Sequence, residues 1–128
     1  MKLKQKNVIA AYKAILELAE VRFPYRTARE VSALRRRLRE EYEVVAEREL
    51  AMAKELGVEA LETGRFRTKD PAGAEAFRQR HEEQMNEEAE IALPAVDLSE
   101  FAETLQVSPD CLEALEGIVS FEKKGEKT

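Results

Sequence analysis

Several residue types are scarce in this sequence, and each shortage excludes a class of protein or site. Among 128 residues there is no tryptophan, one cysteine and one histidine. The single cysteine, Cys111, cannot form an internal disulfide, and no His/Cys group surrounds it as a zinc site requires. We therefore expect a small buried thiol at this position. Only five glycines and four prolines interrupt a chain in which 37% of residues are charged, which favours a helix-rich protein with long solvated faces.

Long apolar runs are also missing. No run approaches the roughly 18 residues that a membrane-spanning helix needs. The N-terminus starts basic, but Lys13, Glu17 and Glu20 interrupt its apolar part, so the sequence predicts neither a signal peptide nor a membrane span. We expect a cytoplasmic protein that makes no contact with a membrane.

Patterns that carry catalysis or bind metals are absent from the sequence. The only histidine, His81, lies four residues from both Phe77 and Met85, and is expected to be a packed or partly exposed residue. The segment "HEEQM" lacks the second histidine of the zinc-protease pattern, and the glycines are too scattered for a phosphate-binding loop. We therefore predict no catalytic residue, no cofactor, no metal and no enzymatic activity.

Two long helices are predicted in the first half of the chain. Asn7 is the expected N-cap of the first helix. Thr27 and Glu30 have the spacing of a capping box and open a second helix over 28–56. Gly57 ends that helix, because glycine takes the left-handed conformation of a helix terminus without strain.

Shorter elements follow. Asp70 and Pro71 are a typical N-cap and first residue of a third helix. The segment "EIALPAV" is predicted to be an edge strand, because its proline cannot lie in a central one, and we expect it to pair with "MKLK" or "GRFRT". Ser99 and Ser108 are the expected caps of two short helices.

These elements predict a mainly α fold: an antiparallel helical bundle or hairpin with one long central helix, a small β patch and two short C-terminal helices. Residues 1–121 are expected to form a single domain, and 122–128 a disordered charged tail. The predicted core consists of Val8, Tyr12, Ile15, Ala19, Leu34, Leu38, Tyr42, Val45, Phe77, Met85, Ile91, Leu93, Leu98, Leu105, Leu112 and Leu115.

Charge is distributed very unevenly along the chain. Residues 1–39 hold eleven Lys/Arg and three Glu, a net charge of +8, while residues 40–128 hold ten Lys/Arg and 23 Asp/Glu, a net charge of −13, which together give −5. The predicted helix 28–56 carries its arginines first and its glutamates last, against the preference of the helix macrodipole. Its candidate interaction residues are Arg29, Arg35, Arg36, Arg37, Arg39, Glu40, Glu43 and Glu47.

Three explanations of this charge order remain open. The acidic half of the third helix, with Glu82, Glu83, Glu87 and Glu88, could neutralise the arginines inside the chain. Two copies of the helix 28–56, antiparallel and crossed near Arg39 and Glu40, would set each arginine half against a glutamate half. The basic patch Arg22–Arg39 could also bind the phosphates of a nucleic acid, although the chain is acidic and no groove-reading motif is present.

A further alternative comes from the segment "REEYEVVAERE". It is similar to the acidic helices of all-α nucleotide pyrophosphatases, which hold magnesium with carboxylates spaced E-E-x-x-E. Val44 stands where the third glutamate would be, and no later E-x-x-D follows. A metal-dependent nucleotide hydrolase is therefore the third alternative, behind an interaction module and a nucleic-acid-binding protein.

The overall layout resembles small uncharacterised helical proteins encoded by phages and prophages of Gram-positive bacteria. Three segments carry the likeness: "MKLKQKNVIAAYKAI", "TAREVSALRRRLREEYEVVAERELAMAKELG" and "ALPAVDLSEFAETLQVSPDCLEAL". The resemblance implies an accessory or assembly role with a phage or host protein as partner, and it supplies no catalytic residues. We therefore predict a non-catalytic protein–protein interaction module that forms a homo-oligomer through the helix 28–56.

Overall fold

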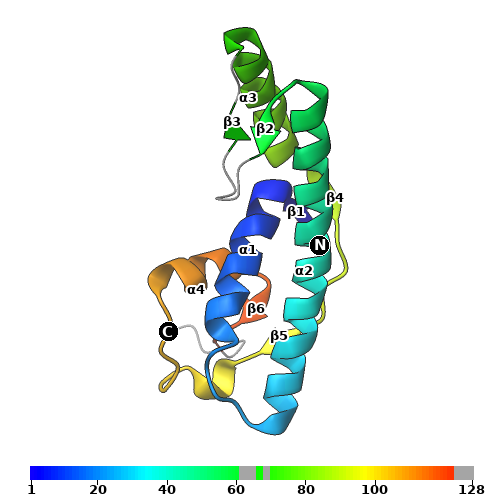
Figure 1. Ribbon diagram of the computed structural model, residues 1–128. Coiled ribbons are helices and arrows are strands. Elements are labelled where there is room, and N and C mark those ends of the chain that lie inside the picture. The colour runs from blue at the N-terminus through cyan, green and yellow to red at the C-terminus, as the bar shows by residue number, and fades with distance from the viewer. Residues whose placement is uncertain (61–65, 68–69, 123–128) are drawn as a thin grey trace.

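A computed structural model describes residues 1–60, 66–67 and 70–122. In these residues the chain is mainly helical, with small two-stranded sheets between the helices (Figure 1). The elements in chain order are β1 (Lys2–Lys4), α1 (Gln5–Leu18), α2 (Tyr25–Glu55), β2 (Glu59–Ala60), β3 (Phe66–Arg67), α3 (Pro71–Met85), β4 (Glu88–Glu90), β5 (Val96–Asp97), the 3₁₀ helix η1 (Ser99–Phe101), α4 (Pro109–Leu115) and β6 (Val119–Ser120). The charged tail predicted over 122–128 lies, except for residue 122, outside the described residues.

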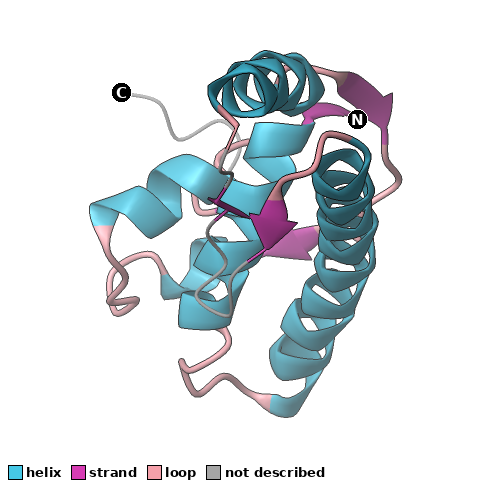
Figure 2. Cartoon of the chain, turned by 45° about the horizontal axis from the view of Figure 1, so that its top comes forward, coloured by secondary structure: helices cyan, strands magenta, loops and turns pink. Residues whose placement is uncertain are grey.

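The helices α1 and α2 form a hairpin whose facing stripes make the main core. Ile15 and Leu18 of α1 and Leu34 and Leu38 of α2 are completely buried in one cluster, which α4 and the strands β5 and β6 close from the side (Figures 1 and 2). Burying such side chains stabilises the fold by about 1.5–3 kcal/mol each. The predicted hairpin of α1 and α2 is therefore confirmed. In Figure 1, α2 lies along one edge of the molecule.

The start of α2 differs from the prediction. The helix begins at Tyr25, directly after Pro24, and no side chain caps its first turn. Thr27 lies inside the helix and is buried, with 7% of its surface exposed, so the capping box with Glu30 does not form. Asn7 is likewise inside α1, which continues directly from β1 and has Lys4 at its N-cap position.

The end of α2 agrees with the prediction. Gly57 has a φ of 70°, in the left-handed region. Its N–H donates to the carbonyl of Lys54 at 3.3 Å, and the N–H of Val58 donates to the carbonyl of Ala53 at 2.7 Å. These two bonds are a Schellman motif, which satisfies carbonyls that the helix end leaves unpaired.

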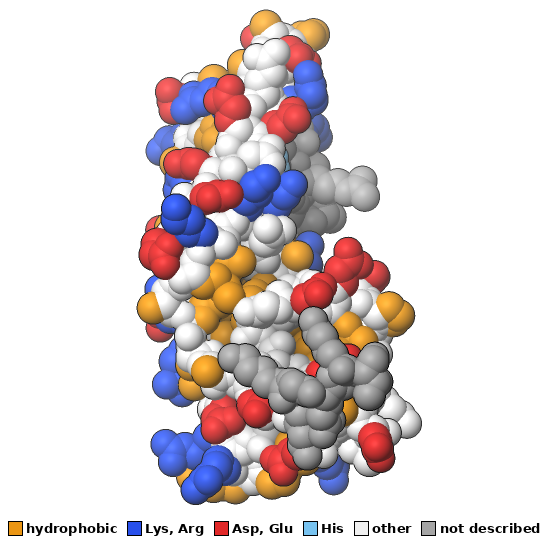
Figure 3. Space-filling view, turned by 180° about the vertical axis from the view of Figure 1, so that it is seen from behind, with side chains coloured by type: hydrophobic (Ala, Val, Ile, Leu, Met, Phe, Trp, Pro, Cys, Tyr) orange, Lys and Arg blue, Asp and Glu red, His pale blue; other side chains and the backbone are white. Residues whose placement is uncertain are grey.

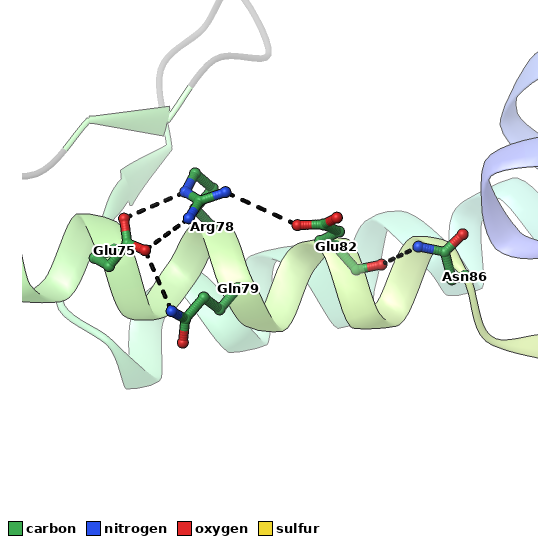
Figure 4. A network of polar contacts seen from close by, with 5 residues as sticks. All are labelled: Glu75, Arg78, Gln79, Glu82 and Asn86. Atoms are coloured by element: carbon green, nitrogen blue, oxygen red, sulfur yellow. Dashed lines mark hydrogen bonds and ion pairs between the residues drawn. The ribbon is translucent and has the colours of Figure 1, made fainter.

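The helix α3 packs antiparallel against the C-terminal half of α2. Its predicted cap is confirmed: Asp70 accepts from the N–H of Ala72 at 3.1 Å, with Pro71 at the first helical position. His81, half-buried as expected, contacts Glu49 of α2 at 3.0 Å. The exposed side of α3 carries a network of its own side chains, in which Arg78 lies between Glu75 and Glu82 (Figure 4).

The small strands tie distant parts of the chain together. The segment "MKLK" takes part in a strand pair as predicted, but its partner differs: β1 pairs antiparallel with β4, so that Lys2 faces Glu90 and Lys4 faces Glu88. The predicted strand "EIALPAV" (90–96) is wrong for most of its length, because only Glu90 belongs to β4 and only Val96 to β5, and Pro94 between them lacks the N–H that a strand ladder needs. The strands β2 and β3 form a second antiparallel pair, and β5 and β6 a parallel one. Ser99 does not cap an α-helix: the segment after β5 is the 3₁₀ helix η1, with Leu98 at its N-cap position.

A single carboxylate joins α1 to α4. Glu17 accepts from the backbone N–H of Ser108 at 2.7 Å and from its hydroxyl at 2.8 Å. The Ser108 Oγ in turn accepts from the N–H of Cys111 at 3.1 Å, which confirms Ser108 as the cap of α4. These hydrogen bonds lower the pKa of Glu17 below its usual value of 4.5.

Most of the predicted core is buried or half-buried, with one error. Leu112 is 40% exposed on α4, and the adjacent Cys111 is buried in its place, as expected for a small thiol. Burial raises the pKa of Cys111 to about 11, so the group stays protonated at neutral pH. The buried side chains not in the predicted list include Ala11, Ala14, Leu18, Val31, Val96 and Val119.

Glu17→Gln is expected to lower the melting temperature at neutral pH. Because the folded pKa of Glu17 lies below 4.5, its charge contributes stability above that pH, and this contribution is lost as the pH falls through the folded value. The difference between wild type and variant should therefore shrink in acid. Thermal unfolding of wild type and variant, measured from neutral pH down into acid, checks this prediction. Glu20→Gln, whose carboxylate makes no hydrogen bond to a described residue, is the control, and equal pH profiles for both variants would contradict the assignment.

The buried pair Gln5 and Gln84 provides a second test. The Gln84 amide donates to Gln5 Oε1 at 2.9 Å, while Gln84 Oε1 has no partner among the described residues. Gln5→Leu alone should reduce the free energy of unfolding by about 1–3 kcal/mol, because it leaves a buried donor poorly paired. The double variant Gln5→Leu/Gln84→Leu should be close to wild type. Urea unfolding of both single variants and the double variant gives the coupling, and simple additivity would argue against the pair.

Candidate interaction surface

The described residues contain no group of three or more His, Cys, Asp or Glu side chains arranged to hold a metal ion. The carboxylates of "REEYEVVAERE" lie on different sides of α2: Glu40, Glu43 and Glu47 are exposed, whereas Glu41 pairs with Arg37 and Glu49 contacts His81. No helix in the described ranges is long and apolar enough to cross a membrane. The most distinctive surface feature of the described chain is instead the exposed side of α2.

We call the exposed side of α2, opposite its buried stripe, the outer face. A helix turns 100° per residue, and exposed residues recur on this side along the whole of α2. Charge is segregated along it, with arginines in the first half and glutamates in the second. In Figure 3, Lys and Arg side chains gather at the lower end of the molecule, where α2 begins. The outer face consists of Tyr25, Arg29, Arg36, Glu40, Glu43, Glu47 and Leu50, followed in the last turn by Lys54, the one basic residue of its second half.

The arginines of the predicted site have different surroundings. Arg37 is paired within its own helix, with Glu41 at 2.5 Å and with Glu40 at 3.7 Å. Arg29 stacks over the ring of Tyr25, 5.8 Å from its centroid. Arg35 is turned toward the end of α1, where it lines a small hollow.

Two further predicted arginines, Arg36 and Arg39, are exposed and form no ion pair with a described residue. The same holds for Glu43 and Glu47 in the second half of α2. Five of the eight predicted residues belong to the outer face. Among these five, only Glu40 forms an ion pair with a described residue. These are the residues Arg29, Arg36, Glu40, Glu43 and Glu47.

In the structure, α3 does not neutralise the arginines in the first half of α2. Glu87, in the short segment between α3 and β4, pairs with Arg48 at 2.8 Å. Further along, Arg80 pairs with Glu55 at 3.3 Å. The third helix therefore lies opposite the second half of α2, and its carboxylates do not meet the arginines of the first half.

A shallow hollow borders the outer face at the beginning of α2. Its α2 side is formed by residues of the first three turns, including Tyr25, Arg26 and Arg29, and its other side by Pro94 and Ala95. Arginines beside an aromatic ring and an apolar floor form a surface that suits an anion attached to an apolar or planar group.

Two large apolar residues of the outer face were not among the predicted site residues. Tyr25 is 76% exposed and Leu50 51%. They were missed because periodicity identifies the buried stripe, and isolated exposed apolar residues are normal on protein surfaces. Their positions at the two ends of the outer face, seven helical turns apart by the geometry of roughly 3.6 residues per turn, are the signal that could have revealed them.

Comparisons of the chain with protein-family models, with curated proteins and with solved structures found no match. The fold and the surface together describe a mainly helical protein that presents a charge-segregated helix face.

Substitutions on the outer face should leave the monomer folded. Because Arg36 is exposed and has no ion pair with a described residue, we expect Arg36→Glu to change the free energy of unfolding by less than about 0.5 kcal/mol. Leu38→Ala, on the buried side of the same helix, should reduce it by about 2–5 kcal/mol. Urea unfolding measures both. A large loss for Arg36→Glu would mean that this arginine has a partner within the folded chain.

Proposed function

We propose that this protein is a non-catalytic protein–protein interaction module that self-associates through α2. Two copies lie antiparallel with their outer faces together, so that the arginine half of each helix meets the glutamate half of the other. The observation that carries the proposal is the set of arginines and glutamates that share one exposed face without ion pairs to other described elements. In this arrangement α2 becomes the central helix, with α1 on one side and the second copy on the other.

Electrostatics favour a second copy over other partners. An antiparallel two-fold pair is self-complementary when one half of the face is basic and the other acidic. A single exposed ion pair contributes only about 0–1 kcal/mol. In the antiparallel pair every contact occurs twice, however, and the charged groups lose part of their solvent. The association is expected to weaken in high salt, because salt screens contacts that remain near the surface.

The biological setting proposed for this module is an accessory or assembly role in a phage or prophage, in the cytoplasm of a Gram-positive host. The resemblance of three chain segments to small phage-encoded helical proteins supports it. A phage or host protein is the further partner in this setting.

Nucleic-acid binding through Arg22–Arg39 is the second candidate function. The observations that favour it are the exposed arginines and the hollow beside Tyr25, where phosphates and bases find cationic and aromatic partners. Glu40, Glu43 and Glu47 continue the same face, however, and would repel a phosphate backbone that follows the helix. The net charge of −5 acts in the same direction.

Charge reversal with complementation tests the proposal. Arg29→Glu/Arg36→Glu makes the outer face acidic except for Lys54, and Glu40→Arg/Glu47→Arg makes it largely basic. Each variant alone should self-associate at least about tenfold more weakly than wild type, a difference of about 1.4 kcal/mol, because like charges then face one another. An equimolar mixture of the two variants should form a heterodimer. Sedimentation velocity at several protein concentrations measures all three samples.

Matched control variants make the same changes in net charge by substitutions outside the outer face. Each reversal changes the charge by two, so Lys6→Glu/Lys13→Glu on α1 has the same −9 as the acidic variant. Glu83→Arg/Glu103→Arg has the same −1 as the basic variant. Wild type that stays monomeric throughout the micromolar range, or a mixture that does not associate, would refute self-association. Tighter and more salt-dependent DNA binding by the basic variant, without self-association of wild type, would support the second candidate.

A further inference from the structure

The outer face has apolar residues at both ends and opposite charges between them. Tyr25 stands at the arginine end and Leu50 at the glutamate end. In the described chain only six large hydrophobic side chains are strongly exposed, and three of them, Tyr25, Val44 and Leu50, belong to α2. Of these three, Tyr25 and Leu50 belong to the outer face and Val44 does not.

Three pairs of outer-face residues are centred on the same point of α2. Tyr25 and Leu50, Arg29 and Glu47, and Arg36 and Glu40 each have their midpoint at Leu38 or immediately beside it. Each pair joins complementary chemistry, apolar with apolar or positive with negative. In an antiparallel two-fold pair, residues equidistant from the axis face one another. All three kinds of contact can therefore form in a single register.

The same pairs also agree in their direction around the helix. A two-fold axis perpendicular to both helices brings the same flank of each helix together, so partner residues must point the same way. At 100° per residue, Arg29 and Glu47 coincide in direction, and Tyr25 and Leu50 differ by about 20°. Arg36 and Glu40 differ by about 40°. Complementary residues therefore share both their distance from the centre and their flank.

The arginine end of the face is already arranged for such a contact. The Arg29 guanidinium lies 5.8 Å from the centroid of the Tyr25 ring, so a cation and an aromatic surface stand side by side. In the second copy, Glu47 and Leu50 lie one turn apart on one flank and present a carboxylate and an aliphatic group at matching positions. The charged pair and the apolar pair would thus form together.

We propose that Tyr25 of each copy packs against Leu50 of the other, and that these two contacts set the register of the antiparallel pair. This inference rests on the proposed self-association. Charges alone do not define the register, because Arg36 can face Glu40 or, one turn away, Glu43. In the shifted register Leu50 faces Arg29, and the Tyr25 contact is lost.

Disulfide trapping tests the register. The native Cys111 is buried and should not interfere. A mixture of Tyr25→Cys and Leu50→Cys chains should give a disulfide-linked heterodimer under mild oxidation. Each variant alone should give almost none, since two copies of position 25 lie about 37 Å apart along the pair and a disulfide requires Cα atoms within about 7 Å. Non-reducing electrophoresis and mass spectrometry read the products.

Arg29→Cys is the register control. If Leu50→Cys links to Arg29→Cys in preference to Tyr25→Cys, the pair is shifted by one turn and the inference is wrong. If Tyr25→Cys links to itself, the helices are parallel, which overturns it as well. A mixture that forms no cross-link, although wild type sediments as a dimer, would place the contact elsewhere.

A truncation provides a second readout without introduced cysteines. Leu50→Ala should weaken self-association by about tenfold, because both ends of the pair lose an apolar contact. Leu112→Ala removes another exposed leucine, 40% exposed against 51% for Leu50, from α4 and should have no effect. Equal behaviour of the two variants, together with successful charge complementation, would refute the register and leave self-association standing. A monomeric wild type would refute the proposed function itself.

Discussion

The burial of one stripe of α2 against α1 is the contact on which the rest of the molecule depends. Leu34 and Leu38 are completely buried against Ile15 and Leu18. Because the faces of a helix are rigidly related, this contact also determines the direction of every other side chain of α2. Charged residues half a turn away from the stripe must point outward. The outer face is therefore a direct consequence of the core.

The order of charges along α2 opposes the helix macrodipole, at a cost of tenths of a kcal/mol for each exposed group. The fold relieves this only in part: Arg37 is paired within the helix by Glu41, whereas Arg36 and Arg39 have no ion pair with a described residue. The ion pairs between α2 and the region of α3 lie further along, where Glu87, just after α3, pairs with Arg48 and Arg80 of α3 pairs with Glu55. In the proposed antiparallel pair, a second copy would provide the matching sequence of charges.

Local signals predicted much of the fold. Gly57, Asp70 and Ser108 each mark the helix end that they were expected to mark, because a left-handed φ or a side-chain cap depends on a few neighbouring residues. The strand at "MKLK" followed from its pattern as well, but its partner, β4, lies almost entirely before the segment "EIALPAV" that was predicted to pair. The failures are also instructive. Thr27 has the right spacing for a cap, but α2 begins two residues earlier, and the threonine is buried in the helix. Leu112 was expected in the core and is exposed, whereas Cys111 is buried as expected, since the rotation of a seven-residue helix decides which of two adjacent residues is covered.

The candidate surface depends both on the order of residues within α2 and on how the other helices pack against it. Periodicity and charge order are properties of adjacent residues, so an unbroken helix with a basic and an acidic half could be predicted from the chain itself. The half of α2 against which α3 packs could not be predicted from the chain itself. It depends on how the connector after Gly57 returns the chain and on the contacts of His81 and Glu87 with α2. The helix α3 packs beside the second half of α2 through Glu49 and Glu55, so that the outer face stays exposed along its whole length. Packing, which sums weak contacts between residues distant in the chain, thus decided which sides of α2 are covered.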